Sequence, residues 1–279
     1  MGKSPEMNQA ASQMAVLANL AEFDHEGTVR YIEGAPHLKH PRLRALYVSL
    51  VLRAFNTAKQ FTHVPRVLDI GAGEGSATLP FLELGASVTA VDISESQLAA
   101  LVERCSRFRD RLEVRHEDFS ETLRCKEDRY DVVVMNSFLH HVPDYLGLIH
   151  EAILVLRPNG LLFSFQDPLR YDTLGRGAWF LSKFAYFSWR VFQGNYMQGL
   201  KTRFRRLRGV YIPGSKEDDA EYHVTRNGVD QDAIAKLLES EGFAFTIIRY
   251  FSTQSAVFQV LGTCMGLENT FAIIAQRSG

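Results

Sequence analysis

The stretch VLDIGAGEGSATLPFLELGASVTAVDIS carries carboxylates and glycines that packing alone would not require. Asp69 and Asp92 each stand near the end of a short apolar run, and Gly71, Gly73 and Gly75 follow the first run. Glycines let the chain turn sharply and let a ligand lie against bare backbone amides. Asp92 comes 17 residues after Gly75, close to the separation of about 20 residues that places an acid on a ribose diol. The pattern predicts a nucleoside ligand.

Asp69 distinguishes between two kinds of nucleoside ligand. A pyrophosphate binds where a helix N-terminus offers positive potential, and a carboxylate beside the loop opposes that potential. The spacing D-x-G-x-G-x-G also departs from the dinucleotide motif, because Ser76 stands where the third glycine belongs. Taken singly, Asp69 or Asp92 could be a helix cap. Together with the glycines, they favour S-adenosylmethionine, which carries an ammonium and a sulfonium group, over NAD as the cofactor.

The elements that must hold these residues follow from the periodicity of the chain. Short apolar runs (RVLDI, SVTAVDI, LEVRH, YDVVVMN and GLLFSFQD) alternate with helical segments such as SESQLAALVERCSRF and LGLIHEAILVLRPNG. A helix, DQDAIAKLLESEG, and strands at 245–251 and 271–276 complete the pattern. Unbroken apolar strands between helices indicate a parallel sheet covered on both faces. We expect an α/β fold with a Rossmann-like, doubly wound sheet of seven strands, mostly parallel, with an antiparallel last strand.

Two further segments flank or interrupt this sheet. Apolar residues at helical spacing predict a helix over 7–21, a polar loop follows over 22–41, and a second helix begins at Pro41. We therefore expect an N-terminal helical cap over 1–60 and a main domain over 61–279. A helical lid insertion over 168–226 separates the fifth and sixth strands.

Composition sets limits on partners and compartment. Lys and Arg number 31 against 32 Asp and Glu, so the overall charge attracts neither nucleic acid nor a membrane surface. Cys105, Cys125 and Cys264 lie far apart without metal-binding or redox spacing, which fits a reducing compartment. The N-terminal residues lack an uninterrupted apolar core. We expect a cytoplasmic protein without a signal peptide or integral membrane association.

The run from Arg66 to Asp167 resembles the core of class I S-adenosylmethionine-dependent methyltransferases. The similarity is to the small-molecule branch (methyltransferase type 11) with quinone-biosynthesis and antibiotic-sugar O-methyltransferases. ILVLRPNGLLFSF matches that family's helix, Pro-Gly turn and fifth strand, so we interpret 157–160 as a structural turn. The resemblance implies that the methionine part of the cofactor is held by Asp69, Gly71, Ala72, Gly73 and, more loosely, Gly75.

The same resemblance assigns the rest of the cofactor. It implies that Asp92 binds the ribose hydroxyls and that Ile93 packs on adenine. Asp118 and Phe119 resemble the pair that recognises the adenine edge, although Asp118 alone could be only a turn former. Asn136, which ends the fourth strand, resembles the residue that lies along the methionine part.

A histidine pair follows the fourth strand in SFLHHVPD. His140 and His141 lie where the methyl group should emerge, and histidine is suited to take a proton near neutral pH. The resemblance extends to antibiotic-sugar enzymes, which carry a similar pair and an aspartate that matches Asp167. One histidine, with a slight preference for His141, is then a base that Asp167 orients, unless Asp167 binds a substrate hydroxyl. The pair could instead only line the pocket.

The acceptor side of the site is expected in the insertion and the N-terminal loop. GAWFLSKFAYFSWRVFQGNY is rich in aromatic residues, which favours packing against helices or a second subunit, with a lid over an apolar acceptor as the alternative. KTRFRRLRG could bind an anionic group or be a solvated face. Candidate acceptor-binding residues are Tyr31, His37, His40, Tyr196, Tyr222 and His223. The first three could instead belong to a surface loop whose polar groups are satisfied.

Three functions remain open at this level. The leading one is methylation of a hydroxyl on a natural product, sugar or quinone-like metabolite of secondary metabolism. The second is N- or C-methylation of an aromatic or prenylated metabolite, and the third is a non-catalytic nucleoside-binding module. NSFLHH replaces the Pro-Pro-aromatic motif of amino-methylating nucleic-acid enzymes, and no cluster suggests a metal site. We therefore expect a small-molecule acceptor, no nucleic acid and no metal, with a homo-oligomer through N-terminal or aromatic helices as an option.

Overall fold

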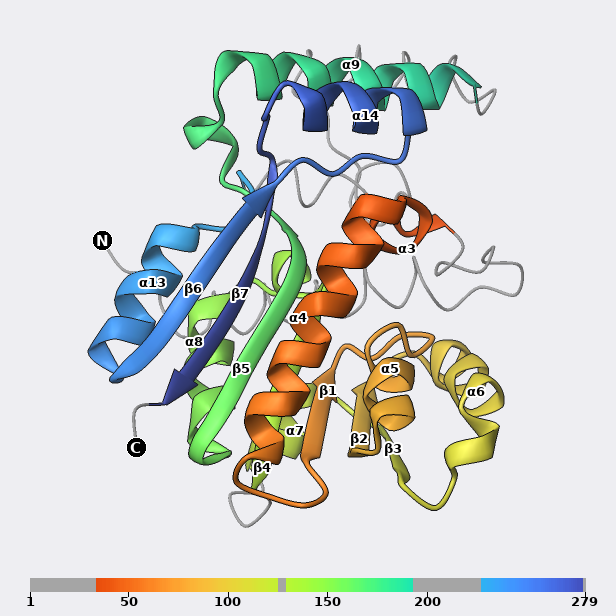
Figure 1. The fold of residues 1–279 in the computed structure, drawn as a ribbon, viewed down its shortest axis with the longest axis vertical. Coiled ribbons are helices and arrows are strands. Elements are labelled where there is room, and N and C mark those ends of the chain that lie inside the picture. The colour runs from red at the N-terminus through yellow and green to blue at the C-terminus, as the bar shows by residue number, and fades with distance from the viewer. Residues whose placement is uncertain (1–33, 125–128, 193–226, 278–279) are drawn as a thin grey trace, which may run out of the picture.

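A computed structural model describes residues 34–124, 129–192 and 227–277. Within these residues, strands form one seven-stranded sheet in the order β3-β2-β1-β4-β5-β7-β6. The neighbours from β3 to β5 are parallel, whereas β7 is antiparallel to both β5 and β6, which confirms the predicted sheet (Figure 1). The strands are β1 Arg66–Ile70, β2 Ser87–Asp92, β3 Leu112–His116, β4 Tyr130–Asn136, β5 Leu156–Pro168, β6 Phe243–Tyr250 and β7 Thr270–Arg277.

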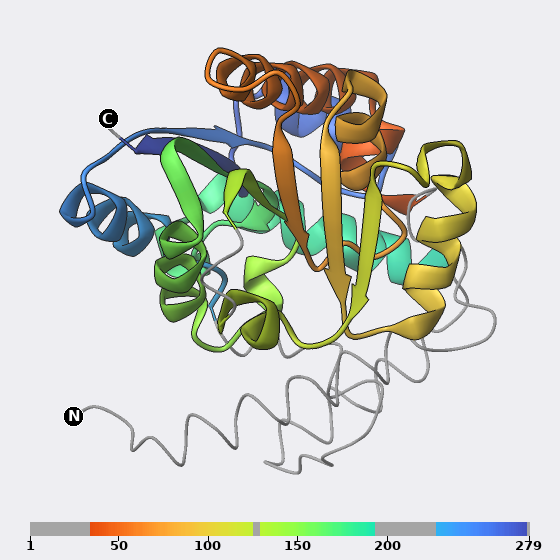
Figure 2. The same cartoon turned by 90° about the horizontal axis from the view of Figure 1, so that it is seen from below.

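Helices cover both faces of this sheet (Figure 2). The described helices are α3 Pro36–Lys39, α4 Pro41–Lys59, α5 Thr78–Leu84, α6 Glu95–Arg104, α7 Phe119–Arg124, α8 Tyr145–Leu154, α9 Arg176–Phe192, α13 Gln231–Ser240 and α14 Ala256–Cys264, with short 3₁₀ turns η1 Ser106–Phe108, η2 Leu139–His141 and η3 Tyr171–Thr173. Val67 joins the apolar cluster of α4, α5 and α6, and its neighbour Leu68 joins that of α7, α8 and α13, because successive strand residues face opposite ways. None of the helices in the described ranges is long and apolar enough to cross a membrane.

The N-terminal part of the described chain packs directly on the sheet. Helix α4 begins at Pro41, as predicted, and buries Leu43, Tyr47, Leu50 and other apolar residues along one face. The prediction of a loop over 22–41 is wrong for Pro36–Lys39, which form the short helix α3. Pro at the first helical position is pre-organised for that turn. The helix predicted over 7–21 lies outside the described residues.

Strand β5 begins earlier than the sequence suggests. The residues Arg157–Gly160, which we interpreted as a turn, belong to the strand Leu156–Pro168. Asn159 has a φ of 63° there, and the pairing with β4 shifts its register between Tyr130 and Val132. The irregular segment is therefore part of strand β5 and does not form a separate turn between α8 and the strand.

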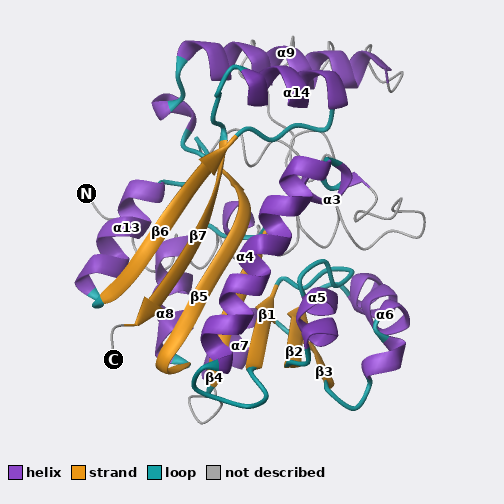
Figure 3. Ribbon diagram, viewed as in Figure 1, coloured by secondary structure: helices purple, strands orange, loops and turns teal. Residues whose placement is uncertain are grey.

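Helices α9 and α14 lie side by side beyond the carboxyl ends of β5 and β6 (Figures 1 and 3). The small or aliphatic residues Ala178, Leu181 and Ala185 form the buried side of α9. Among the α9 side chains whose burial the structure describes, Phe180 is 64% exposed and Phe184 is 47% exposed. Phe184 makes an edge contact with Phe258 of the neighbouring helix α14, and packing on a second subunit or over an acceptor stays a prediction for the exposed rings.

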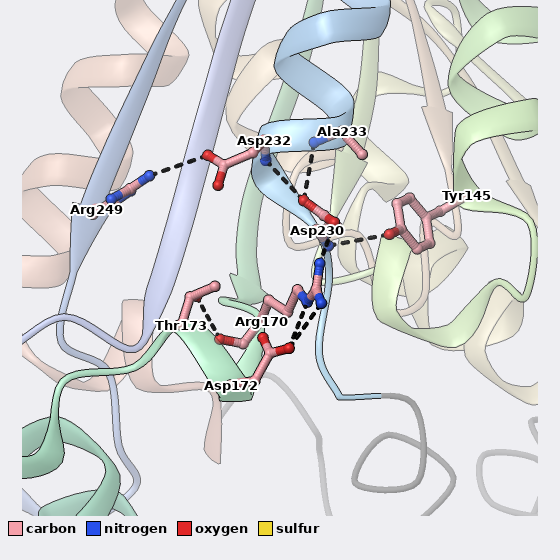
Figure 4. Close-up of polar contacts among 8 residues, drawn as sticks. All are labelled: Tyr145, Arg170, Asp172, Thr173, Asp230, Asp232, Ala233 and Arg249. Carbon is pink, nitrogen blue, oxygen red and sulfur yellow. Dashed lines mark hydrogen bonds and ion pairs between the residues drawn. The ribbon is translucent and has the colours of Figure 1, made fainter.

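The two ends of the insertion are joined where it leaves and re-enters the domain. Leu169 forms a parallel bridge with Val229, and the Val229 amide donates to the carbonyl of Pro168 at 3.0 Å. Arg170 donates to the carboxylates of both Asp172 and Asp230, each at 2.8 Å (Figure 4). This neck fixes where the insertion is attached to the sheet.

Candidate active site

The loop between β1 and α5 needs its glycines for both conformation and space. Gly71, Gly73 and Gly75 have φ values of 69°, 51° and 84°, a region that side chains other than glycine rarely adopt. A β-carbon at Gly71 would also lie 2.1 Å from the ring of Phe138. The amides of Gly71 and Ala72 both donate to the carbonyl of Val91 in β2. The loop is therefore held tightly over the carboxyl ends of β1 and β2.

Asp69 is buried at the end of β1 and holds the start of α5. The Thr78 hydroxyl donates to its Oδ2 at 2.6 Å, while Oδ1 has no hydrogen-bond partner among the described residues. Burial, with a smaller contribution from the charge of Asp92, raises the pKa of Asp69 to about 7. A carboxyl group in this state is ready to pair with a cation, since an opposite charge would favour its ionised form.

Asp92 ends β2 and binds the glycine loop from the other side. Its Oδ2 accepts from the Gly73 amide at 2.8 Å, and its Oδ1 accepts from the Ser94 amide at 2.9 Å. Burial raises the pKa of Asp92, whereas these backbone bonds lower it. The next residue, Ile93, receives a hydrogen bond on its carbonyl from the His116 ring at 3.0 Å. The structure thus brings the second aspartate to the same loop as the first.

The residues expected near adenine lie beside the same loop. Asp118 accepts from the Ser120 amide at 2.9 Å at the start of α7. The ring of Phe119 meets the ring of Phe138 edge to face, with centroids 5.9 Å apart. Since Phe138 packs over Gly71, it joins the β3 side of the site to the glycine loop. Sequence reasoning missed Phe138, although it lies within the quoted SFLHHVPD.

Asn136 ends β4, the strand that pairs with β1 at the point where the strand order reverses. Its Nδ2 donates to the Ser76 hydroxyl at 2.8 Å and lies 3.4 Å from Nε2 of His37 on α3. Its Oδ1 is buried without a partner in the described part of the chain. Sequence reasoning considered Ser76 only as a departure from the dinucleotide motif. The contact with Asn136 could not be inferred from sequence spacing.

His140 and Asp167 form a close pair beside these residues. His140 Nδ1 lies 2.8 Å from Asp167 Oδ1, and the backbone amide of His140 donates to the same oxygen at 3.2 Å. Asp167 is fully buried, and its Oδ2 accepts from the Ser164 hydroxyl at 2.8 Å. A bulge in β5, with a φ of 71° at Gln166, turns Asp167 toward η2. This geometry holds one imidazole in a defined orientation.

His141 lies next to the pair in a different environment. It is buried, and its ring centroid is 4.2 Å from that of His140. The 2.8 Å contact of its neighbour His140 with Asp167 makes His140 a candidate for the histidine that Asp167 orients.

The structure describes only two of the predicted acceptor-binding residues, His37 and His40. His37 lies against Asn136, and His40 is joined to the carbonyl of Thr253 at 2.8 Å. Other candidates lie outside the described residues, namely Tyr31, Tyr196, Tyr222, His223 and the basic run KTRFRRLRG. Within residues 34–124, 129–192 and 227–277, no cluster of three or more histidine, cysteine, aspartate or glutamate side chains could hold a metal ion.

The buried acceptor atoms indicate which cofactor fits. Asp69 Oδ1 and Asn136 Oδ1 stand at neighbouring strand ends without partners among the described residues. Burying such atoms unpaired is costly, so a ligand that donates hydrogen bonds would satisfy them. The methionine part of S-adenosylmethionine offers an ammonium donor, whereas a pyrophosphate offers only negatively charged acceptors. These residues therefore fit S-adenosylmethionine.

Comparison with known proteins agrees with this fit. The demethylmenaquinone methyltransferase of Tropheryma whipplei (strain Twist) is 33% identical over 107 residues, covering 38% of this chain and 44% of that protein. The ubiquinone biosynthesis O-methyltransferase of Actinobacillus pleuropneumoniae serotype 7 (strain AP76) is 30% identical over 102 residues, covering 35% and 44%. The chain thus spans less than half the length of these relatives. Magnesium protoporphyrin IX methyltransferase from Synechocystis PCC 6803, solved with bound S-adenosylmethionine, shares the fold with a TM-score of 0.51 at 14% identity, covering 100% of both chains.

A sequence profile of the methyltransferase domain extends the match beyond these segments. It aligns with residues 39–246, which is more than half of the 279-residue chain. The aligned part contains the glycine loop, Asp69, Asp92 and the histidine pair. The sheet order agrees with this match, as do the acceptor atoms at the strand ends that have no partner among the described residues. The match shows that the chain belongs to the methyltransferase domain family.

Proposed function

We propose that the chain transfers the methyl group of S-adenosylmethionine to a hydroxyl oxygen of a small-molecule acceptor. The observation that carries the choice of oxygen is the pair of His140 and Asp167, with Nδ1 and Oδ1 2.8 Å apart. The pair follows Phe138, which packs on the glycine loop at Gly71. A base beside the cofactor site is useful for a hydroxyl acceptor, whose proton must be removed.

The chemistry divides between the cofactor and the residues of the chain. When bound, S-adenosylmethionine supplies a methyl group that its sulfonium has already activated. His140 donates from Nδ1 to the Asp167 carboxylate, so the neutral ring carries its lone pair on Nε2. Nε2 then accepts the proton of the acceptor hydroxyl, and the buried carboxylate of Asp167 stabilises the imidazolium that forms. Ser164 and the His140 amide keep Asp167 in place.

The acceptor class is supported by the relatives. One of them is named for demethylmenaquinone methylation and another for O-methylation in ubiquinone biosynthesis. Quinone-like phenols are therefore the first acceptors to test, followed by sugars and hydroxylated natural products. N- or C-methylation of an aromatic or prenylated metabolite is the second candidate, which the aromatic residues of α9 favour.

Transfer of a labelled methyl group tests the reaction and the base together. With a phenolic acceptor, His140→Ala should lower kcat by about 100-fold or more, since general base catalysis typically contributes 10²- to 10⁴-fold. His141→Ala, in the neighbouring position, should lose much less. The kcat of the native enzyme should fall at acid pH, and affinity for S-adenosylhomocysteine should be unchanged in His140→Ala.

The same assay separates the competing functions. Full activity of His140→Ala on the preferred acceptor would refute the role of His140 as base and would favour an N- or C-methyltransferase. Binding of S-adenosylhomocysteine without methyl transfer to any phenol, sugar, amine or prenylated acceptor would favour the non-catalytic nucleoside-binding module.

A further inference from the structure

His37 is a buried polar residue whose environment does not satisfy it. It lies on α3, is 1% exposed, and meets the rings of Tyr47 and Phe165 edge to face at 5.0 and 5.6 Å. Its Nε2 lies 3.4 Å from Nδ2 of Asn136. Its Nδ1 is buried and has no hydrogen-bond partner among the described residues.

The contact with Asn136 fixes which ring nitrogen carries the proton. An amide nitrogen can only donate, so Nε2 of His37 must accept and the neutral ring carries its proton on Nδ1. Burial lowers the pKa of His37 to about 4, which keeps the ring neutral near pH 7. Nδ1 is therefore a buried N–H donor that lacks an acceptor among the residues that the structure describes.

The neighbouring histidine, His40, is in a different situation. His40 is also buried, but its Nε2 lies 2.8 Å from the carbonyl of Thr253. The His40 contact joins the end of α3 to the loop after β6 and needs no ligand. An unpaired donor such as that of His37 costs free energy in a core unless something binds it.

Three buried atoms without partners in the described part of the chain lie on the neighbouring elements β1, β4 and α3. Asp69 Oδ1 and Asn136 Oδ1 are acceptors at the ends of the paired strands β1 and β4, and His37 Nδ1 is a donor beside Asn136. An α-amino acid group has the complementary chemistry, with an ammonium that donates and a carboxylate that accepts. The methionine end of the proposed cofactor carries both groups.

We infer that His37 binds the cofactor and not the acceptor: its Nδ1–H donates to the carboxylate of the methionine end, while Asp69 and Asn136 accept from the ammonium. This inference rests on the proposed function, because it assumes an S-adenosylmethionine cofactor. It gives α3 a specific role, since this short helix would supply His37 to the part of the site that binds the methionine end of the cofactor. It also differs from the sequence expectation, which placed His37 on the acceptor side.

Calorimetry with two ligands tests the inference without relying on activity. S-adenosylhomocysteine has the amino-acid end, and 5′-methylthioadenosine lacks it. His37→Phe, which keeps a ring but removes the donor, should weaken binding of S-adenosylhomocysteine by about 10- to 100-fold, as expected for a hydrogen bond to a charged group. Its affinity for 5′-methylthioadenosine should stay within about twofold of the native value. His37→Gln, which retains a donor, should recover part of the loss.

Two control variants place the effect along the cofactor. His40→Phe changes the other buried histidine of this segment and should leave the ratio of the two affinities unchanged. Asp92→Asn should weaken both ligands alike, because Asp92 is expected at the ribose that they share. Thermal melts of each variant check that it is folded.

The outcomes separate the inference from the proposed function. If the native chain binds both ligands and His37→Phe and His37→Gln both keep the native ratio of the two affinities, the inference is wrong while the proposed cofactor stands. If the native chain binds neither ligand, the proposed cofactor itself fails, and the role of His37 fails with it.

Discussion

At the scale of single residues, the protonation of Asp69 is expected to depend on cofactor binding. Its pKa is raised to about 7, mainly by burial, so part of the free protein carries a proton on Asp69 near pH 7. A bound ammonium group would favour the charged carboxylate and lower this pKa. We therefore expect S-adenosylhomocysteine binding to release protons near pH 7. Calorimetry in buffers of different ionisation enthalpy measures this release directly.

The Asp69→Asn variant is the matched test of that expectation, since the amide keeps the shape of the side chain but cannot titrate. Proton release near pH 7 should disappear in it, and affinity for S-adenosylhomocysteine should fall. If the variant releases as many protons as the native chain, Asp69 is not the linked group.

The limits of sequence reasoning are clearest for individual contacts. The clustering of Asp69, Asp92 and the glycines could be predicted because they lie within one short segment of the chain. The bond between Ser76 and Asn136 joins residues 60 positions apart, and the contact of Asn136 with His37 spans 99 positions. Such pairs depend on the strand order and on how α3 packs, which residue spacing does not encode.

Among the elements, the neck of the insertion depends on the start of α13. Asp230 accepts from the amides of Asp232 and Ala233 and pairs with Arg170, while its own amide donates to the Tyr145 hydroxyl at 3.1 Å (Figure 4). Asp230→Ala removes this N-cap and should lower the free energy of unfolding by about 1 kcal/mol. Urea denaturation of the full chain measures the change.

Asp172 offers a matched control for that prediction. It pairs with the same arginine at 2.8 Å but caps no described helix. Asp172→Ala should therefore destabilise the chain much less than Asp230→Ala, because exposed ion pairs contribute little. Equal losses in the two variants would mean that the contacts of Arg170, and not the cap, hold the neck.

Predictability also differs between kinds of element. The strands that flank the site could be predicted because they are short, continuous apolar runs, of which β4 is buried at every position. Helix α14 was missed: Val257 and Val260 are 74% and 62% exposed, so its apolar residues do not mark a core-facing stripe. Helix α3 was missed because four residues are too few for helical periodicity to show.

At the scale of the whole molecule, two buried groups of the site should make opposite contributions to stability. The pKa of Asp69 is raised from 3.8 to about 7, so the unfolded chain loses that proton first and stability falls as pH rises from 4 to 7. The pKa of His37 is lowered from 6.5 to about 4, so the unfolded chain gains that proton first and stability falls as pH drops from 6.5 to 4. Each slope is at most about 1.4 kcal/mol per pH unit, and between pH 4 and 6.5 they oppose each other.

Single variants should separate these two contributions. Relative to Asp69→Asn, the native chain should lose free energy of unfolding as pH rises from 4.5 to 7. Relative to His37→Gln, it should gain free energy of unfolding as pH rises from 4.5 to 6.5. Urea denaturation at intervals across this range gives both differences, and other titrating groups cancel because each comparison is with the native chain. Differences that are flat, or that share one sign, would show that burial does not hold Asp69 protonated and His37 neutral, and hence that the amino-acid end of the site is wetter than its geometry indicates.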